Sequence, residues 1–144
     1  LHNPNMLVVF TGHHTYVSAT WYSNKYIPST WNYMSVHVKG IIRFLDDDAL
    51  MDVLQKTTLH FEGYNAQSTT VFNNLPKDLV HRLMKQIVAF EVEIQDINHV
   101  FKLSQDRDQE SYLNIISKLK EQGENGQVIA EEMEKRTRRQ FNLE

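Results

Sequence analysis

The chain has 144 residues, of which 41% are hydrophobic, and it carries a formal net charge of −3. These values indicate a single domain, residues 1–144, and the acidic balance argues against a protein that binds nucleic acid through overall positive charge. Because there is no cysteine, the chain has no disulfide, no thiolate metal site and no cysteine nucleophile. No apolar run is long enough to predict a membrane span, and we expect a cytoplasmic protein.

The first third of the chain is dominated by strand patterns and aromatic side chains. Met6–Thr11 is a short apolar run and residues 15–20 alternate, which predicts two neighbouring strands. From Trp31 a long alternating strand follows, and Gly40 marks an expected bulge or barrel corner. Residues 12–45 hold both tryptophans and four of the six tyrosines. This density fits either a well-packed barrel wall or a surface that receives a flat polar ligand.

Helix and hairpin signals follow in the middle of the chain. Three aspartates, Asp46–Asp48, precede an apolar set at helical spacing, and we interpret them as capping residues rather than metal ligands. Pro76 is expected at the first position of a second helix. Residues 88–95 alternate again, and residues 96–99 are typical of a turn into a strand at 100–103, which predicts a β-hairpin.

Two helices are expected to close the chain. Asp106 or Asp108 should cap the first of them, which should end at Gly123. The last, roughly 127–140, has a thin apolar set and is expected to be exposed. Its charges predict three pairs four residues apart, Glu131 with Lys135, Glu132 with Arg136, and Glu134 with Arg138.

Motifs for several kinds of chemistry are absent. The sequence has no GxGxxG, Walker or HExxH motif and no nucleophile elbow, so we predict no catalytic residue and no metal ligand. The run 102–107 offers two cations, a hydroxyl and an amide beside a helix start, which suits a phosphate or a carboxylate. The alternative for this run is an exposed turn with solvated charges.

Three segments resemble the signature segments of the PaiB family, which comprises bacterial proteins described as FMN-binding negative transcriptional regulators. The segments are GHHTYVSATWY, IPSTWNYMSVHVKG and AFEVEIQDINHVFKLSQDR. His13, Ala19, Ala89 and Asp106 depart from the residues usual in the family. The resemblance implies an α+β fold, namely a split β-barrel with peripheral helices and C-terminal helices at about 107–140. It also implies a homodimer with FMN at the interface and an earlier segment with the first strands, which agrees with a chain that enters a fold abruptly at Leu1.

The resemblance also assigns candidate cofactor-binding residues. They are Trp31, Asn32, Tyr33, His37, Lys102, Ser104, Gln105 and Arg107. By the same resemblance we expect a negative regulator of sporulation and degradative-enzyme genes, with DNA as its partner, rather than an enzyme. Two alternatives stay open, a flavin- or haem-dependent oxidoreductase on the same fold and a protein-interaction module.

Overall fold

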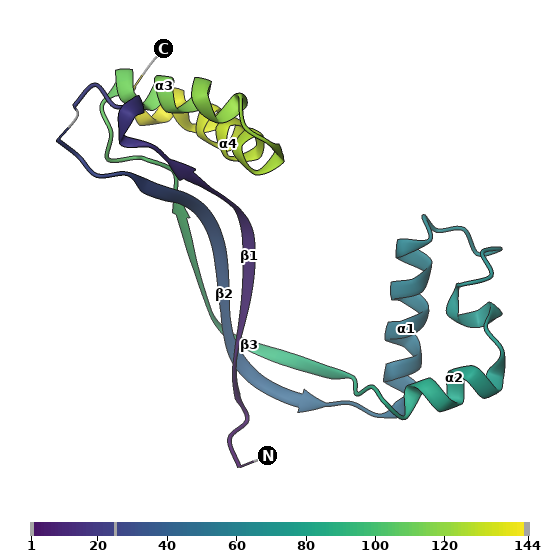
Figure 1. Ribbon diagram of the computed structural model, residues 1–144. Helices are drawn as coiled ribbons and strands as arrows, with labels where there is room; N and C mark the ends of the chain where they lie inside the picture. The colour runs from purple at the N-terminus through teal and green to yellow at the C-terminus, as the bar shows by residue number, and fades with distance from the viewer. Residues whose placement is uncertain (1, 25, 143–144) are drawn as a thin grey trace. The chain divides into compact units, whose positions relative to one another are not determined.

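The computed structural model describes residues 2–24 and 26–142 and has an α+β fold (Figure 1). The strands form an antiparallel sheet in the order β1-β2-β3, and their bounds are β1 Asn5–Val17, β2 Thr30–Phe44 and β3 Phe90–Lys102. The helices are α1 Asp47–Phe61, α2 Lys77–Met84, α3 Gln109–Lys120 and α4 Glu124–Gln140, with short 3-10 helices η1 Ala19–Trp21 and η2 Phe72–Asn74. Leu1, where we expect the chain to enter the fold, lies outside the described residues. No helix in the described ranges is long and apolar enough to cross a membrane.

The described residues divide into two compact units. The first comprises the residues up to Met6 together with Lys39–Gln95, and the second comprises Leu7–Val38 together with the residues from Asp96 onward. The first unit therefore holds α1, η2 and α2, and the second holds η1, α3 and α4. The single-domain expectation stays a prediction.

Two strand predictions are wrong in the same way. Residues 5–17 form one strand rather than two neighbours, and residues 90–102 form one strand rather than a hairpin. Gly12 does not end β1; a Cβ there would lie 3.3 Å from the Met34 Cβ, so the glycine allows close approach to β2. The polar run at 96–99 stays extended because pairing along β2 outweighs its local turn preference.

Gly40 lies within the continuous strand β2, where we expected a bulge or corner. A Cβ at Gly40 would lie 2.3 Å from the Glu93 carbonyl oxygen and 2.6 Å from Val92 Cγ1. A side chain at this position would collide with the neighbouring strand. The glycine is therefore needed for close strand approach.

The helix starts of the first unit follow the sequence closely. Asp46 caps α1, because its carboxylate accepts a hydrogen bond from the Ala49 amide at 2.9 Å. Asp47 and Asp48 occupy the first turn, where the helix dipole favours acids. Pro76 is the N-cap of α2, one position before the one expected. The capping interpretation of the aspartates is thus confirmed for Asp46.

The core of the second unit lies where α3 and α4 pack on the sheet ends, and the two helices lie side by side (Figure 1). Asp108 caps α3, which ends at Lys120, while Gly123 is the N-cap of α4. The expectation of an exposed last helix is wrong, because Ile129, Ala130 and Met133 are fully buried. The buried cluster consists of Val17, Tyr22, Leu103, Tyr112, Ile115, Ile116, Leu119, Ile129, Ala130 and Met133.

The charges on α4 pair differently from the expected pattern. Glu132 and Arg136 form the expected pair. Lys135 also contacts Glu132, at 2.5 Å, instead of Glu131. Glu134 pairs with Lys120 of α3 at 2.6 Å rather than with Arg138. Two of the three predicted pairs are therefore replaced, one by a pair three residues apart on α4 and one by a tertiary contact with α3.

Candidate functional site

Asn32 and Ser104 form a buried polar pair where β2 begins and β3 ends. Asn32 is fully buried, and the Ser104 hydroxyl donates a 3.0 Å hydrogen bond to Asn32 Oδ1. Asn32 Nδ2 in turn contacts Met133 Sδ at 3.5 Å. Ser104 has a φ of 61°, a left-handed conformation that is uncommon for serine. The Asn32 amide is thus used within the protein, where it holds the turn after β3 in place.

The turn after β3 is tied down by further hydrogen bonds. Lys102 Nζ donates to Thr30 Oγ1 at 2.6 Å. The Leu103 amide donates to Gln105 Oε1 at 2.7 Å, and Gln140 Nε2 of α4 donates to the Gln105 carbonyl at the same distance. Because strand, turn and last helix are joined here, the turn is held in a defined conformation, while Lys102, Gln105 and Asp106 stay exposed.

Arg107 and Tyr22 form a second contact of this turn. The Arg107 guanidinium lies 4.7 Å from the centroid of the Tyr22 ring, and its NH2 lies 3.3 Å from Asp106 Oδ2. Arg107 Nε and the Tyr22 hydroxyl are both buried and find no hydrogen-bond partner among the described residues. Such orphaned groups cost stability unless something else satisfies them.

An open groove with an aromatic wall lies between residues of β1, Trp31 of β2 and the segment that leads into α4. It has a volume of about 460 Å³, and its aromatic lining comes from His14, Tyr16 and Trp31. The Trp31 ring centroid is 5.9 Å from that of His14 and 6.0 Å from that of Tyr16. The opposite wall is the segment from Gln122 to Gly126 at the start of α4. The groove therefore presents ring faces on one side and, on the other, backbone together with the amides of Gln122 and Asn125 and the carboxylate of Glu124.

Side-chain hydrogen bonds join the segment 122–126, the wall opposite the aromatic rings, to β1. Thr15 Oγ1 donates to Gln122 Oε1 at 2.7 Å, and His13 Nδ1 lies 2.8 Å from Asn125 Oδ1. The segment 122–126 was not among the predicted site residues. Its only local signal was Gly123, which we interpreted as a helix end.

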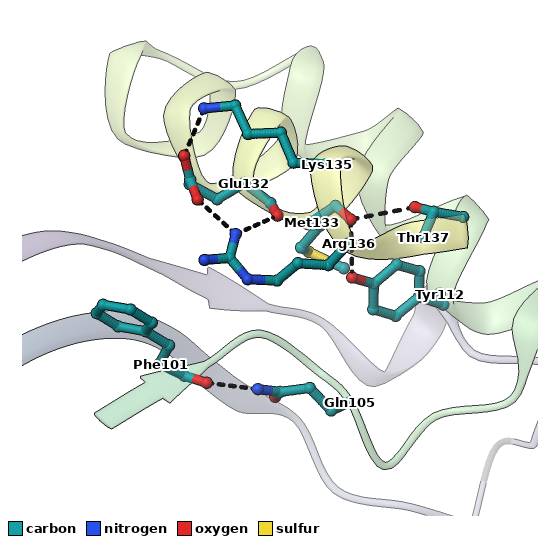
Figure 2. Close-up of polar contacts among 8 residues, drawn as sticks. All are labelled: Phe101, Gln105, Tyr112, Glu132, Met133, Lys135, Arg136 and Thr137. Carbon is teal, nitrogen blue, oxygen red and sulfur yellow. Dashed lines mark hydrogen bonds and ion pairs between the residues drawn. The ribbon is translucent and has the colours of Figure 1, made fainter. Parts of the chain in front are cut away.

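A cationic cluster on α4 covers the end of β3 (Figure 2). Glu132 accepts hydrogen bonds from Lys135 and Arg136, and the Arg136 guanidinium also donates to the Glu132 carbonyl at 2.7 Å. These hydrogen bonds, the one from Lys135 foremost, lower the pKa of Glu132. The Arg136 guanidinium lies 5.7 Å from the centroid of the Phe101 ring. Two basic residues of the C-terminal tail are thus used in packing and pairing.

The structure gathers some of the predicted site residues and separates others. The start of β2 and the turn after β3 come together, through the contacts of Thr30 with Lys102 and of Asn32 with Ser104. Trp31 is 51% exposed and faces the groove, whereas its neighbour Asn32 is buried. Tyr33, an exposed ring, and His37, half-buried, lie further along β2 and outside the groove lining. The binding role of all eight residues stays a prediction.

Comparison with known proteins identifies the family of the chain. A domain family described as "Putative FMN-binding domain" matches residues 1–96, and the chain belongs to this family. Among curated relatives, the "Protease synthase and sporulation protein PAI 2" of Bacillus subtilis is 35% identical over 140 residues, which are 95% of this chain and 66% of that protein. The "Uncharacterized protein AN0679" of Emericella nidulans is 29% identical over 128 residues, 78% of this chain and 51% of its own length. The predicted PaiB resemblance is confirmed, and the chain spans less than two thirds of the length of each relative.

Proposed function

We propose that this chain is part of a PaiB-like negative transcriptional regulator whose activity responds to a bound flavin. The main support is the 35% identity to PAI 2, whose name connects that protein with protease synthesis and sporulation. The match to an FMN-binding domain family supports the flavin component. Sporulation and degradative-enzyme genes are the corresponding targets of the proposed regulator.

The aromatic groove supplies a suitable surface for an isoalloxazine ring. Flavin sites combine ring or apolar faces with a few polar partners for the ring edge and cations for the phosphate. Here Trp31 offers an exposed ring face, and Lys102 is the exposed cation nearest the start of β2 through its contact with Thr30. In this proposal the ring stacks on Trp31 and Lys102 is the cation offered to the phosphate, although Lys102 does not itself line the groove. In this proposal Asn32 acts by positioning the turn, because its amide is already bound by Ser104 and Met133.

We also propose that the three-stranded sheet belongs to a split β-barrel in a homodimer. Within the second unit, large apolar side chains of two strands are exposed: Leu7 55%, Val9 45%, Phe10 59%, Ile97 56% and Val100 43%. Apolar surface on this scale is normally covered in a native assembly. Light scattering on the purified protein tests this step, and a monomer at micromolar concentration would argue against it.

Titration with FMN, followed by flavin fluorescence, tests the flavin component. Stacking on Trp31 should quench the flavin, and Trp31→Leu should weaken binding by about tenfold because a ring–ring contact is lost. Tyr26→Leu is the matched control, since Tyr26 is 98% exposed and lies outside the groove. Saturable binding with equal affinity in the parent protein, Trp31→Leu and Tyr26→Leu would exclude the Trp31 groove as the flavin site. A titration without any change in fluorescence would remove the flavin from the proposal.

DNA binding tests the regulatory component independently. On α4, Lys135 and Arg136 are held by Glu132, which leaves Arg138 and Arg139 as exposed cations in the last turn. Selection of sheared genomic DNA at about 150 mM salt, with excess competitor, should enrich specific fragments if repression is direct. Binding no stronger than to random DNA would exclude direct repression by this chain. Reduction of bound flavin by NADH, without such enrichment, would favour the oxidoreductase alternative.

A further inference from the structure

An apolar chamber of about 110 Å³ lies in the first compact unit, between α1 and the segment that contains η2 and α2. Its lining comprises Leu54, Thr58, Phe72, Leu75, Val80, Leu83, Met84 and Ile87. Thr58 supplies the only hydroxyl in this lining. Its Oγ1 donates to the Leu54 carbonyl at 2.9 Å and accepts from the Phe72 amide at 3.0 Å. Because an apolar cavity without free polar partners stays dry, this chamber suits hydrocarbon rather than water.

A wider groove of about 390 Å³ adjoins the chamber. The two share Phe72, Leu75, Val80 and Met84 as lining residues. The wider groove adds Met51 and three polar residues, Asn73, Lys77 and His81. We treat the two as the apolar end and the polar mouth of one candidate site because they share these four residues, and the volume of the wider groove alone falls within the usual range for small-molecule sites.

The mouth of this cavity is cationic. Lys77 and His81 lie one turn apart on α2, and neither forms a hydrogen bond or an ion pair with the rest of the described chain. Lys77 is the cation in the lining of the mouth, whereas Arg82 and Lys85 lie on the same segment outside the lining, and Asp78 is the acid of the first turn of α2. A ligand with an anionic end would therefore find complementary charge at the mouth.

We propose that this cavity binds a medium-chain alkyl carboxylate, with the alkyl end in the apolar chamber and the carboxylate beside Lys77 and His81. A chamber of about 110 Å³ is too small for a whole medium chain, so the end of the chain fills the chamber and the remaining methylenes lie against Phe72, Leu75, Val80 and Met84 in the wider groove. This site lies in the other compact unit from the Trp31 groove and goes beyond the proposed function. The protein then binds a second ligand besides the flavin, and it selects this ligand by the length of the alkyl chain and by the negative charge of the carboxylate.

Isothermal titration of the full chain with hexanoate, octanoate and decanoate tests the proposal. Affinity should rise by about fourfold for each added methylene that is buried in the chamber or against the apolar part of the wider groove, since a fourfold change corresponds to the transfer free energy of one buried methylene. Decanol should bind about two- to fivefold more weakly than decanoate because it lacks the charge. Absence of saturable binding, equal affinity for all three chain lengths, or decanol binding as tightly as decanoate would overturn the proposal.

Matched variants locate the binding within the cavity. Lys77→Gln should weaken decanoate binding about two- to fivefold, whereas Lys85→Gln, on the same segment but outside the lining, should not. Val80→Phe should fill the chamber and abolish the dependence on chain length, with an unchanged circular dichroism spectrum as evidence that it folds. Equal losses in the two lysine variants, or a chain-length dependence that persists in Val80→Phe, would place the ligand elsewhere. FMN titration of the same variants should be unaffected, so a failure here is distinguishable from a failure of the flavin proposal.

Discussion

Removal of one hydroxyl group should have opposite effects at two buried tyrosines. Tyr22 is 3% exposed, and its hydroxyl is buried without a hydrogen-bond partner in residues 2–24 and 26–142. Tyr112 is fully buried, but its hydroxyl donates to the Met133 carbonyl at 3.0 Å. The same substitution to phenylalanine therefore removes an unsatisfied group at one site and a satisfied group at the other.

The expected magnitudes follow from these partners. A buried polar group without a partner costs about 1–3 kcal/mol, so Tyr22→Phe should raise the free energy of unfolding by about that amount. Its ring is kept, and with it the contact to the Arg107 guanidinium at 4.7 Å. Tyr112→Phe should lower the free energy of unfolding by only about 0.5–1.5 kcal/mol. This loss of stability is smaller than the cost of an orphaned group because the Met133 carbonyl keeps a second hydrogen bond, which it accepts from Thr137 Oγ1 at 3.1 Å (Figure 2).

Urea unfolding followed by circular dichroism measures both changes. The denaturation midpoint should move up for Tyr22→Phe and down for Tyr112→Phe, with an unchanged m-value in each variant. A destabilised Tyr22→Phe would refute the reasoning, since it would mean that the Tyr22 hydroxyl has a partner in solution. A Tyr112→Phe variant as stable as the parent would likewise show that its hydrogen bond contributes nothing.

Three further predictions concern the strands, the turn and the last helix pair. Gly40→Ala should destabilise the protein by about 1–3 kcal/mol in urea unfolding, because its Cβ would lie 2.3 Å from the Glu93 carbonyl. Ser104→Ala should cost a similar 1–3 kcal/mol, because Asn32 Oδ1 would stay buried without its donor. Hydrogen bonds from the backbone and side chain of Ser111, the backbone one foremost, lower the pKa of Asp108, so its contribution is present above pH ~4 and is lost as pH falls through the lowered value. Asp108→Asn should therefore lose less thermal stability than the parent between about pH 5 and pH 2.

Controls for these variants are available in the same chain. Gly63→Ala is the control for Gly40→Ala, because an added Cβ at Gly63 would meet no atom of the described residues within 4 Å. Gly63 has a φ of 62°, so any loss of stability in Gly63→Ala reflects backbone strain alone. Ser117→Ala, at an exposed position of α3, should be neutral. Asparagine at 108 keeps an oxygen that can cap the helix but lacks the charge, so its loss of stability should be largest at neutral pH, and a loss that persists unchanged at pH ~2 would contradict the assignment of the effect to charge.

Local signals in the sequence predicted the elements whose ends depend on neighbouring residues. Asp46 and Asp108 were expected as caps, and each accepts a hydrogen bond from the amide three residues further on. The alternation from Trp31 predicted β2 because one face of that strand packs on the core. The three signature segments predicted the family, and the family match confirmed it.

The errors occurred where local preference and tertiary context disagree. Residues 96–99 have turn composition but lie inside β3, and Gly12 lies inside β1. In both places pairing with β2 supplies hydrogen bonds that outweigh the local preference. A single sequence does not show which strand will be the neighbour.

The candidate site also has features that the sequence predicted and features that depend on the tertiary structure. The sequence by itself determined which residue types were present near Trp31 and in the turn that begins at Lys102. Only the tertiary structure decided that Asn32 is buried against Met133, 101 residues away, while Trp31 next to it is exposed in the groove. The physical reason is that a cap or an alternating strand depends on contacts within a few residues, whereas burial depends on which distant segment covers each side chain.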